Sequence, residues 1–235
     1  PWSFPPQRMV DCLSDLRKSL ENNLNTWKTR YIYPDQRFVV FQEMYSISLQ
    51  AHAQSVMIRD HFSQTDWWVA RPELDIKPED RIVRGINMGM RDWTLFGLFE
   101  GIATCWEDAL RQTIQHMPSF LGEVGEMPIE FLLEPLLVAT EQYEYIALIE
   151  LVMATRICLR YGGKYCPHSG EDMALQYKKM HFHFLNKDDI SLPSAFLDTW
   201  EYHTWLIREM VKMLEDLFNS DEVSVVARIP TIHLS

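Results

Sequence analysis

Cysteine and histidine side chains gather in the second half of the sequence, where they could hold a metal ion. Thiolates and imidazoles are the usual ligands of structural zinc. The two cysteines are separated by seven residues, however, whereas structural zinc prefers a tight pair. His181 and His183 are two positions apart, so on the helix predicted there they would point to different sides. We therefore favour a buried Cys158 and half-buried or solvated histidines over a zinc site for the set Cys158, Cys166, His168, His181 and His183.

Signatures of other enzyme classes are missing from the sequence. A di-iron bundle needs a glutamate three residues before a histidine, and no histidine here has one. The sequence also lacks a P-loop, a G-x-G-x-x-G motif and a G-x-S-x-G nucleophile elbow. We therefore expect no metal ion and no cofactor.

Arg111 and His116 lie in the sequence R-Q-T-I-Q-H. This pattern resembles the R-x4-H signature of HEPN ribonucleases, a family of dimeric all-α domains. The resemblance implies that Arg111 holds a phosphate and that His116 performs general acid–base chemistry at the 2′-hydroxyl. The competing interpretation is a surface arginine and a histidine at a helix end before Pro118, where the helix dipole favours it. The net charge of −11 speaks against RNA as the substrate.

Composition limits the class of partner. The chain has 235 residues, of which 47% are hydrophobic, so it can bury a large core. Its net charge of −11 argues against a DNA-binding surface, which needs clustered lysine and arginine, and fits a basic partner. Four cysteines without a framework spacing, together with 12 methionines, indicate a reducing compartment and hence a cytoplasmic location. The sequence begins at Pro1 and not at methionine, so we expect part of a longer protein.

Apolar residues recur every three or four positions through most of the chain, which predicts amphipathic helices. Asp35 can cap the second of these helices and Asp92 the fourth. The packing face of the last helix includes Trp200 and His203. The predicted helices span about residues 7–30, 36–62, 78–90, 93–116, 171–184 and 194–218.

The most apolar stretch, residues 127–163, predicts one long helix enclosed by the others, because it is apolar almost all the way round. Pro135 suits a first helical turn, and Gly162 with Gly163 suits the end. Glutamates interrupt the apolar run too often for a membrane span. We take this segment as the centre of the domain.

These elements predict an all-α fold: a multi-helix, orthogonal or bundle-like domain around a buried central helix of about residues 128–161. We treat 1–235 as a single domain. An alternative division gives an N-terminal helical hairpin at 1–66, a helical core at 67–219 and an extended tail at 220–235. The irregular, β-branched tail could lie on the helices or add a strand to a partner.

Trp67 and Trp68 are adjacent and stand between two turn-forming clusters. Tryptophans in such a loop either fill the core of a neighbouring layer or form an exposed anchor for a partner. We favour the core, and keep both residues as candidate binding residues.

Two segments within residues 80–160 resemble the BART-like family of all-helical domains. One begins at Leu132-Leu133-Glu134-Pro135, continues through an apolar run to Ala139, and is followed by Glu141, Tyr143 and Tyr145. The other leads from Trp93-Thr94 into an apolar-striped helix that ends at Met117-Pro118-Ser119-Phe120. The acidic Phe-Asp-Asp stretch of the family is not evident before the first matched helix.

The resemblance implies a binding module for Arf-like small GTPases, and several members of the family are ciliary. Such a module would hold an amphipathic helix of the GTPase in an apolar groove between its own helices. The aromatic residues of the matched segments, Phe96, Phe99, Tyr143 and Tyr145, are then the candidate binding residues.

The sequence therefore favours a non-enzymatic protein-binding module or scaffold, with an Arf-like small GTPase as the candidate partner. The alternatives are a HEPN-type endoribonuclease that uses Arg111 and His116, and a structural subunit that docks through Trp67, Trp68 or the tail.

Overall fold

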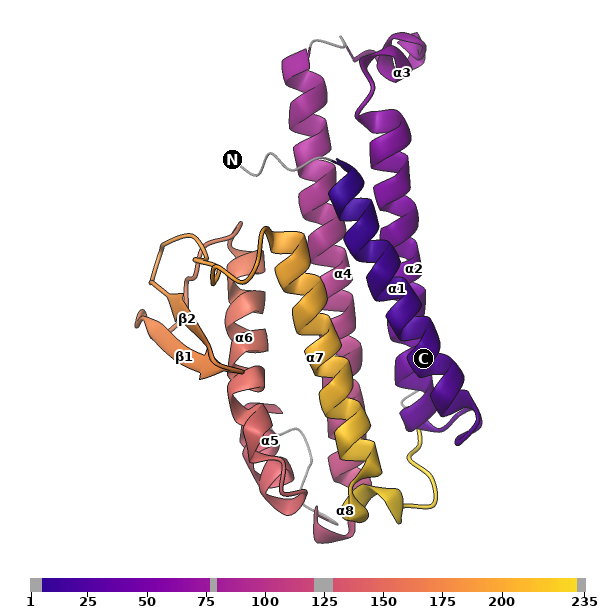
Figure 1. Ribbon diagram of the computed structural model, residues 1–235, viewed down its shortest axis with the longest axis vertical. Helices are drawn as coiled ribbons and strands as arrows, with labels where there is room; N and C mark the ends of the chain where they lie inside the picture. Colours follow the sequence, from indigo (N-terminus) through magenta and orange to yellow (C-terminus); the bar gives the residue numbers. More distant parts are fainter. Residues whose placement is uncertain (1–5, 77–79, 121–128, 232–235) are drawn as a thin grey trace.

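The computed structural model describes residues 6–76, 80–120 and 129–231, most of which are helical. The long helices α1 (Pro6–Lys28), α2 (Gln36–Met57), α4 (Asp80–His116) and α7 (Thr199–Asn219) run side by side along the long axis (Figure 1). α2 packs between α1 and α4, and α7 packs against both α1 and α4. The predicted mostly helical fold is confirmed.

The first two helices form where the apolar periodicity predicts them. The apolar stripe of α1 is buried, including Leu13, Leu16 and Trp27. Asp35 is the N-cap of α2, and its carboxylate accepts a hydrogen bond of 2.9 Å from the backbone N–H of Arg37. α2 continues into a π-helical turn at Ile58–Phe62, so the helix predicted over 36–62 is confirmed in extent.

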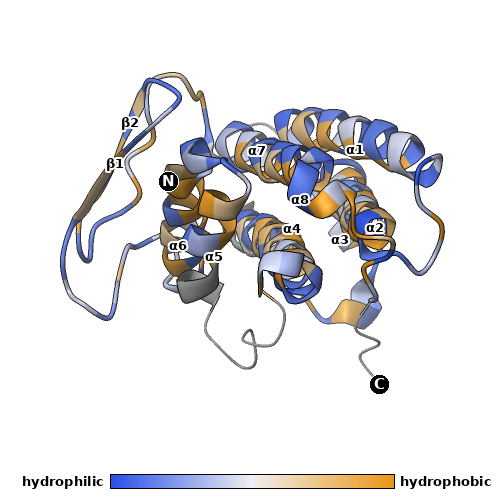
Figure 2. Ribbon diagram, turned by 90° about the horizontal axis from the view of Figure 1, so that it is seen from below, coloured by the Kyte–Doolittle hydropathy of each residue, from blue (hydrophilic) through white to orange (hydrophobic). Residues whose placement is uncertain are grey.

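α4 is one continuous helix, which corrects the prediction of two helices with a cap at Asp92. No proline or glycine interrupts the chain at residues 90–93, and Asp92 lies within the helix and not at its start. Pro78, predicted to open a helix, lies outside the described residues. Seen along its axis, α4 lies between α2, α6 and α7 (Figure 2), and it contacts all three. α4 therefore holds the central position expected of residues 128–161.

The predicted central helix is two helices, α5 (Ile129–Ala139) and α6 (Ile146–Arg160), and its predicted start at 127–128 lies outside the described residues. α5 ends in a Schellman motif: the N–H of Gln142 donates to the carbonyl of Leu137 over 2.8 Å, and Glu141 has φ of +57°. A 3-10 turn, Tyr143–Tyr145, leads into α6. Glutamate occupies the left-handed position that glycine usually takes, so the break could not be recognised from the residue types. Pro135 lies inside α5 and not in its first turn.

A charged cluster joins α6 to α4. The Arg156 guanidinium, with 11% of its side chain exposed, donates to Glu100 over 2.9 Å and also to Glu107. Burial tends to raise the pKa of Glu100, but hydrogen bonds from Arg156 and Arg160 outweigh it and leave that pKa below its usual value. The cluster thus keeps the Glu100 carboxylate ionised at a half-buried helix contact.

Replacing Arg156 with methionine is expected to lower the free energy of unfolding by about 2 kcal/mol, because two carboxylates then lose their charged donor. The matched control is Arg160→Met: its side chain is 54% exposed and bonds the same Glu100, so the loss stays below about 1 kcal/mol. Urea denaturation of both variants measures the difference. Equal losses would contradict this account of the cluster.

The helix predicted over 171–184 is an antiparallel hairpin of β1 (Met173–Tyr177) and β2 (Met180–Phe184). The side chains alternate: Tyr177, Phe182 and Phe184 are buried, while the alternate residues of the two strands face solvent. These exposed residues are Ala174, Gln176, His181 and His183. A short apolar run fits both the helical and the strand period, so the sequence pattern alone led to the wrong assignment of this segment. The hairpin lies beside α6 at one margin of the molecule (Figure 1).

The turn of the hairpin places Lys178 and Lys179 at φ of +46° and +65°, as in a type I′ turn. Lys178 Nζ lies 2.5 Å from a carboxylate oxygen of Glu209 on α7. Tyr177 Oη donates to the same carboxylate over 2.9 Å. These contacts hold a turn whose lysines lack the conformational freedom of the usual Asn-Gly pair.

The last long helix starts later than predicted, at Thr199 and not 194, because Asp198 is its N-cap and accepts from the N–H of Glu201 over 2.8 Å. A short helix, α8 (Asp221–Ser224), follows α7. The tail then runs back to the start of α2, where Pro230 forms a β-bridge with Asp35 and Ile229 is fully buried. Residues 232–235 lie outside the described part of the chain. No helix among the described residues is long and apolar enough to cross a membrane.

Candidate functional site

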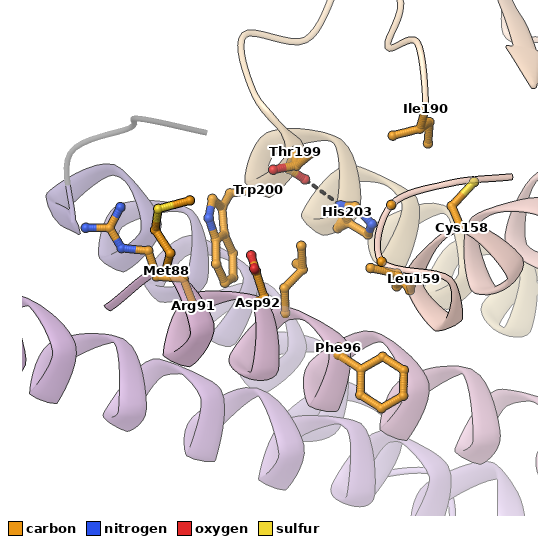
Figure 3. Close-up of a pocket in the computed structure, with 13 residues that line it drawn as sticks. Met88, Arg91, Asp92, Phe96, Cys158, Leu159, Ile190, Thr199, Trp200 and His203 are labelled. Carbon is orange, nitrogen blue, oxygen red and sulfur yellow. Dashed lines mark hydrogen bonds between the residues drawn. The ribbon is translucent and has the colours of Figure 1, made fainter. Parts of the chain in front are cut away.

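A cavity of about 160 Å³ opens between α4, the end of α6 and the start of α7 (Figure 3). α4 contributes the wall from Met88 to Phe96, and the left-handed turn at Gly162 and Gly163 ends α6 at the opposite side. Most of the lining side chains are apolar or aromatic. They are Met88, Leu95, Phe96, Cys158, Leu159, Ile190 and Trp200, with Arg91, Asp92, Thr199 and His203 as the polar members.

His203 is the buried polar group of the cavity, with 3% of the residue exposed. Its Nδ1–H donates to the carbonyl of Thr199 over 2.6 Å (Figure 3), which leaves Nε2 as the acceptor nitrogen. The ring stands edge-on to Phe99, with centroids 5.3 Å apart. Burial lowers the pKa of His203 to about 4, only partly offset by the bond to Thr199. The imidazole is therefore neutral near pH 7.

Cys158 is the other group in the cavity that could react. Burial, and to a smaller degree the neighbouring Cys166, raises the pKa of its thiol to about 12. A protonated thiol is a poor nucleophile and a poor metal ligand. The pKa of His203, about 4, lies far below the pKa of an efficient general base near neutral pH. The cavity therefore holds its two reactive groups in unreactive forms. This chemistry suits binding better than catalysis.

The lining of the cavity includes a carboxylate, and exposed apolar side chains neighbour the lining residues in the sequence. In the view of Figure 3 the Asp92 carboxylate reaches up from α4 between Trp200 and His203. Partial burial raises the pKa of Asp92, and Arg91 partly opposes this shift. Trp93 is 74% exposed and contacts Phe96 edge-on at 6.0 Å between centroids. Leu197, 69% exposed, lies two residues before the start of α7.

A second cavity, of about 350 Å³, lies between α2 and α4, and most of the residues that line it have polar side chains. Glu43 and Asp108 face it, and burial raises the pKa of each carboxyl group. Cys105 lies between them, and burial raises the pKa of its thiol to about 12. Two carboxyl groups face this cavity, so it suits a polar or charged group better than the apolar side chain that the first cavity could take.

The candidate binding residues from the sequence fall in different places. Phe96 lines the first cavity, and the fully buried Phe99 supports it from below through His203. Tyr143 is 54% exposed in the turn before α6, away from the cavity. Tyr145 is buried, and its hydroxyl donates to Asp216.

Trp67 and Trp68 lie in α3 (Thr65–Val69), before a 3-10 turn at Pro72–Leu74. Trp68 is buried, and its Nε1–H donates to the carbonyl of Phe62 over 2.9 Å. Trp67 is half-buried against Phe62, and the Arg71 guanidinium lies 3.9 Å from its ring centroid. Trp68 therefore fills a local core, which removes it as an exposed anchor.

Arg111 and His116 both lie in the last turns of α4, and neither lines the two cavities above. His116 Nδ1–H donates to the carbonyl of Gln112 over 2.8 Å. Asp108, on the same helix, feels the positive charge of Arg111, which counteracts the rise in its pKa. A catalytic role for this pair stays a prediction.

The cysteines and histidines considered for zinc are dispersed. Cys158 is in the cavity, whereas His181 and His183 lie on the solvent face of β2. They share one face because the segment is a strand, which corrects the helical assignment that separated them. Among the described residues, no group of three or more potential ligands is arranged to hold a metal ion.

Sequence reasoning assigned Trp200 and His203 to a packing face and did not connect them with α4 as a site. Their proximity to Asp92 depends on how α7 crosses α4, which no local pattern encodes. No family model, curated protein or solved structure matches this chain.

Proposed function

We propose that the chain is a non-enzymatic protein-binding module that receives an amphipathic helix of its partner in the cavity between α4, α6 and α7. The observation that carries this proposal is the cavity itself, which is apolar within and has the charged side chains of Asp92 and Arg91 in its lining. Helix-in-groove recognition uses such a site: one apolar side chain enters and the polar face of the helix stays in solvent.

The size of the cavity favours one inserted side chain. A cavity of about 150 Å³ holds a benzene-sized group, while drug-sized ligands fill about 300–1,000 Å³. At about 160 Å³, the site accommodates one leucine or phenylalanine side chain better than a nucleotide or cofactor. Met88, Trp93 and Leu197, all exposed, would cover the flanks of the bound helix.

The charge of the site supports a basic flank on the partner helix. Asp92 stands at the mouth beside Arg91, which offsets its charge locally, and the chain as a whole carries a net charge of −11. A lysine or arginine next to the inserted apolar residue would pair with Asp92 and speed association at low salt. An Arf-like small GTPase, whose N-terminal helix would be the ligand, is the partner that we propose. A cytoplasmic, cilium-associated location belongs to the same proposal.

The test measures binding of purified Arf-like GTPases, loaded with GTP or GDP, and of labelled peptides of their N-terminal helices. Ile190→Trp fills the cavity and is expected to weaken binding about tenfold to a hundredfold, since it denies burial of one apolar side chain. Leu185→Trp, at a 50% exposed position outside the cavity, is the matched control and should bind normally.

GTP-dependent capture that Ile190→Trp abolishes supports both the site and the partner. Equal capture in the two nucleotide states, or none, removes the GTPase as partner. Peptide binding that Ile190→Trp leaves unchanged would show that the cavity is not the binding site. RNA cleavage that His116→Ala abolishes would favour the ribonuclease alternative instead.

A further inference from the structure

The outer edge of strand β1 lacks the features that usually protect an exposed strand. β1 pairs only with β2, and Ser191 bridges the opposite edge of β2 at His183. Within the described residues, no backbone hydrogen bond joins the outer edge of β1 to another segment. Its sequence, M-A-L-Q-Y, contains no charge, proline or glycine. Natural edge strands use charge, proline or bulges to prevent pairing with other chains, so this edge is open to pairing.

The register of the hairpin decides which backbone groups are available. The type I′ turn makes Tyr177 and Met180 a hydrogen-bonded pair, and the bonded pairs then recur at Leu175 with Phe182. The backbone N–H and C=O groups of Ala174 and Gln176 therefore point to the open edge. Any added antiparallel strand must pair with these two residues.

The residues that flank β1 make this edge complementary to itself. Glu171 and Asp172 precede the strand, and Lys178 and Lys179 follow it. We propose that β1 pairs antiparallel with β1 of a second copy of this chain, about a two-fold axis at Leu175. In this register Ala174 lies opposite Gln176 of the other copy, so the unpaired backbone N–H and C=O groups of the two copies face one another.

Charge selects this register among those the backbone allows. Centring the axis on Leu175 brings Glu171 opposite Lys179 of the other copy, twice by symmetry. An axis at Ala174 or at Gln176 shifts the pairing by two residues and separates these charges. Asp172 already accepts from the backbone N–H of Asn186 over 2.7 Å, and Lys178 already pairs with Glu209. Glu171 and Lys179, both exposed, are therefore the pair that joins the copies.

The inner face of the hairpin also gains from pairing. Met173 and Leu175 are only half-buried on the side that packs against the helices. In the paired arrangement Leu175 meets its symmetry mate at a non-hydrogen-bonded position, where opposed side chains lie closest. The two hairpins then form one four-stranded sheet whose buried face is continuous.

Sedimentation equilibrium of the full chain over a concentration series tests the proposal. The wild type is expected to associate reversibly to a dimer. Glu171→Lys and Lys179→Glu each place like charges opposite one another twice, and each should weaken the dimer about tenfold. The double variant restores opposite charges and should dimerise like the wild type. A mixture of the two single variants should form a heterodimer that is tighter than the homodimer of either variant, because opposite charges then face one another again.

A backbone variant tests the strand pairing independently of charge. Gln176→Pro removes an N–H that points away from β2, so it should abolish the dimer while circular dichroism and thermal stability show a folded monomer. A wild type that stays monomeric throughout the series overturns the proposal. A dimer that survives Gln176→Pro, or that responds equally to the single and double charge variants, also overturns it.

Discussion

Replacing Asp35 with alanine is expected to lower the free energy of unfolding by about 3–5 kcal/mol, a large part of the stability of a typical domain. The reason is Arg37, whose side chain is fully buried. Its Nε and Nη2 donate to the two carboxylate oxygens of Asp35 over 2.9 Å and 2.8 Å. Without Asp35 the guanidinium stays in the core with no counter-charge beside it, and α2 loses its N-cap.

Chemical denaturation followed by circular dichroism measures this loss. Asp15→Ala is the matched control: that carboxylate is 68% exposed and pairs with Lys18 at 3.7 Å, so its removal should change stability by less than about 1 kcal/mol. The double variant Asp35→Asn, Arg37→Met keeps a cap and removes the buried charge. It should be more stable than Asp35→Ala alone. A loss below about 1 kcal/mol in Asp35→Ala would contradict the role assigned to the pair.

Acidification is expected to destabilise the protein through His203. Its pKa is about 4 in the folded protein and 6.5 in an unperturbed chain. Between these values the unfolded chain binds the proton and the folded protein does not, so stability is present above pH 6.5 and is lost as the pH falls toward 4. The shift corresponds to about 3 kcal/mol. The cost arises because the charged imidazole would have to sit in the apolar cavity.

Comparison with His203→Gln isolates this contribution, because other groups titrate in the same range. The variant should lose less stability than the wild type between pH 6.5 and 4. His181→Gln, on the solvent face of β2, is the control and should follow the wild type. The same comparison in an Asp92→Asn background removes the carboxylate that lines the same cavity. If His203→Gln and the wild type lose stability in parallel, the histidine does not titrate as described.

The elements predicted correctly from the sequence are those for which the apolar pattern is sufficient to determine the secondary structure. α1 and α2 follow a sustained three-to-four periodicity, and Asp35 gives the start of α2. The break between α5 and α6 was missed because Glu141, an unusual residue for that conformation, ends the helix. The hairpin was missed for a related reason, since two lysines occupy its turn in place of Asn-Gly.

The candidate site was only partly accessible from the sequence. Phe96 was a candidate because it lies on the apolar face of the helix that resembles the BART-like family, and it lines the cavity. Asp92 was assigned to a cap, and Trp200 and His203 to packing, because their common cavity exists only after α7 crosses α4. The burial of Arg37 could not be predicted from the sequence either, because its carbonyl acceptors come from Val223 and Val226 at the far end of the sequence.

The meeting of the tail with the start of α2 has a consequence for synthesis on the ribosome. Arg37 is made early, but its acceptors at Val223 and Val226 emerge almost two hundred residues later. α1 also lacks a contact until late in synthesis, because its Arg8 pairs with Asp198. Contacts so distant in sequence slow folding, since a long loop must close before they form. The N-terminal helices must therefore wait, with part of their apolar surface uncovered, until the last helices leave the exit tunnel, and in this interval chaperones would bind them.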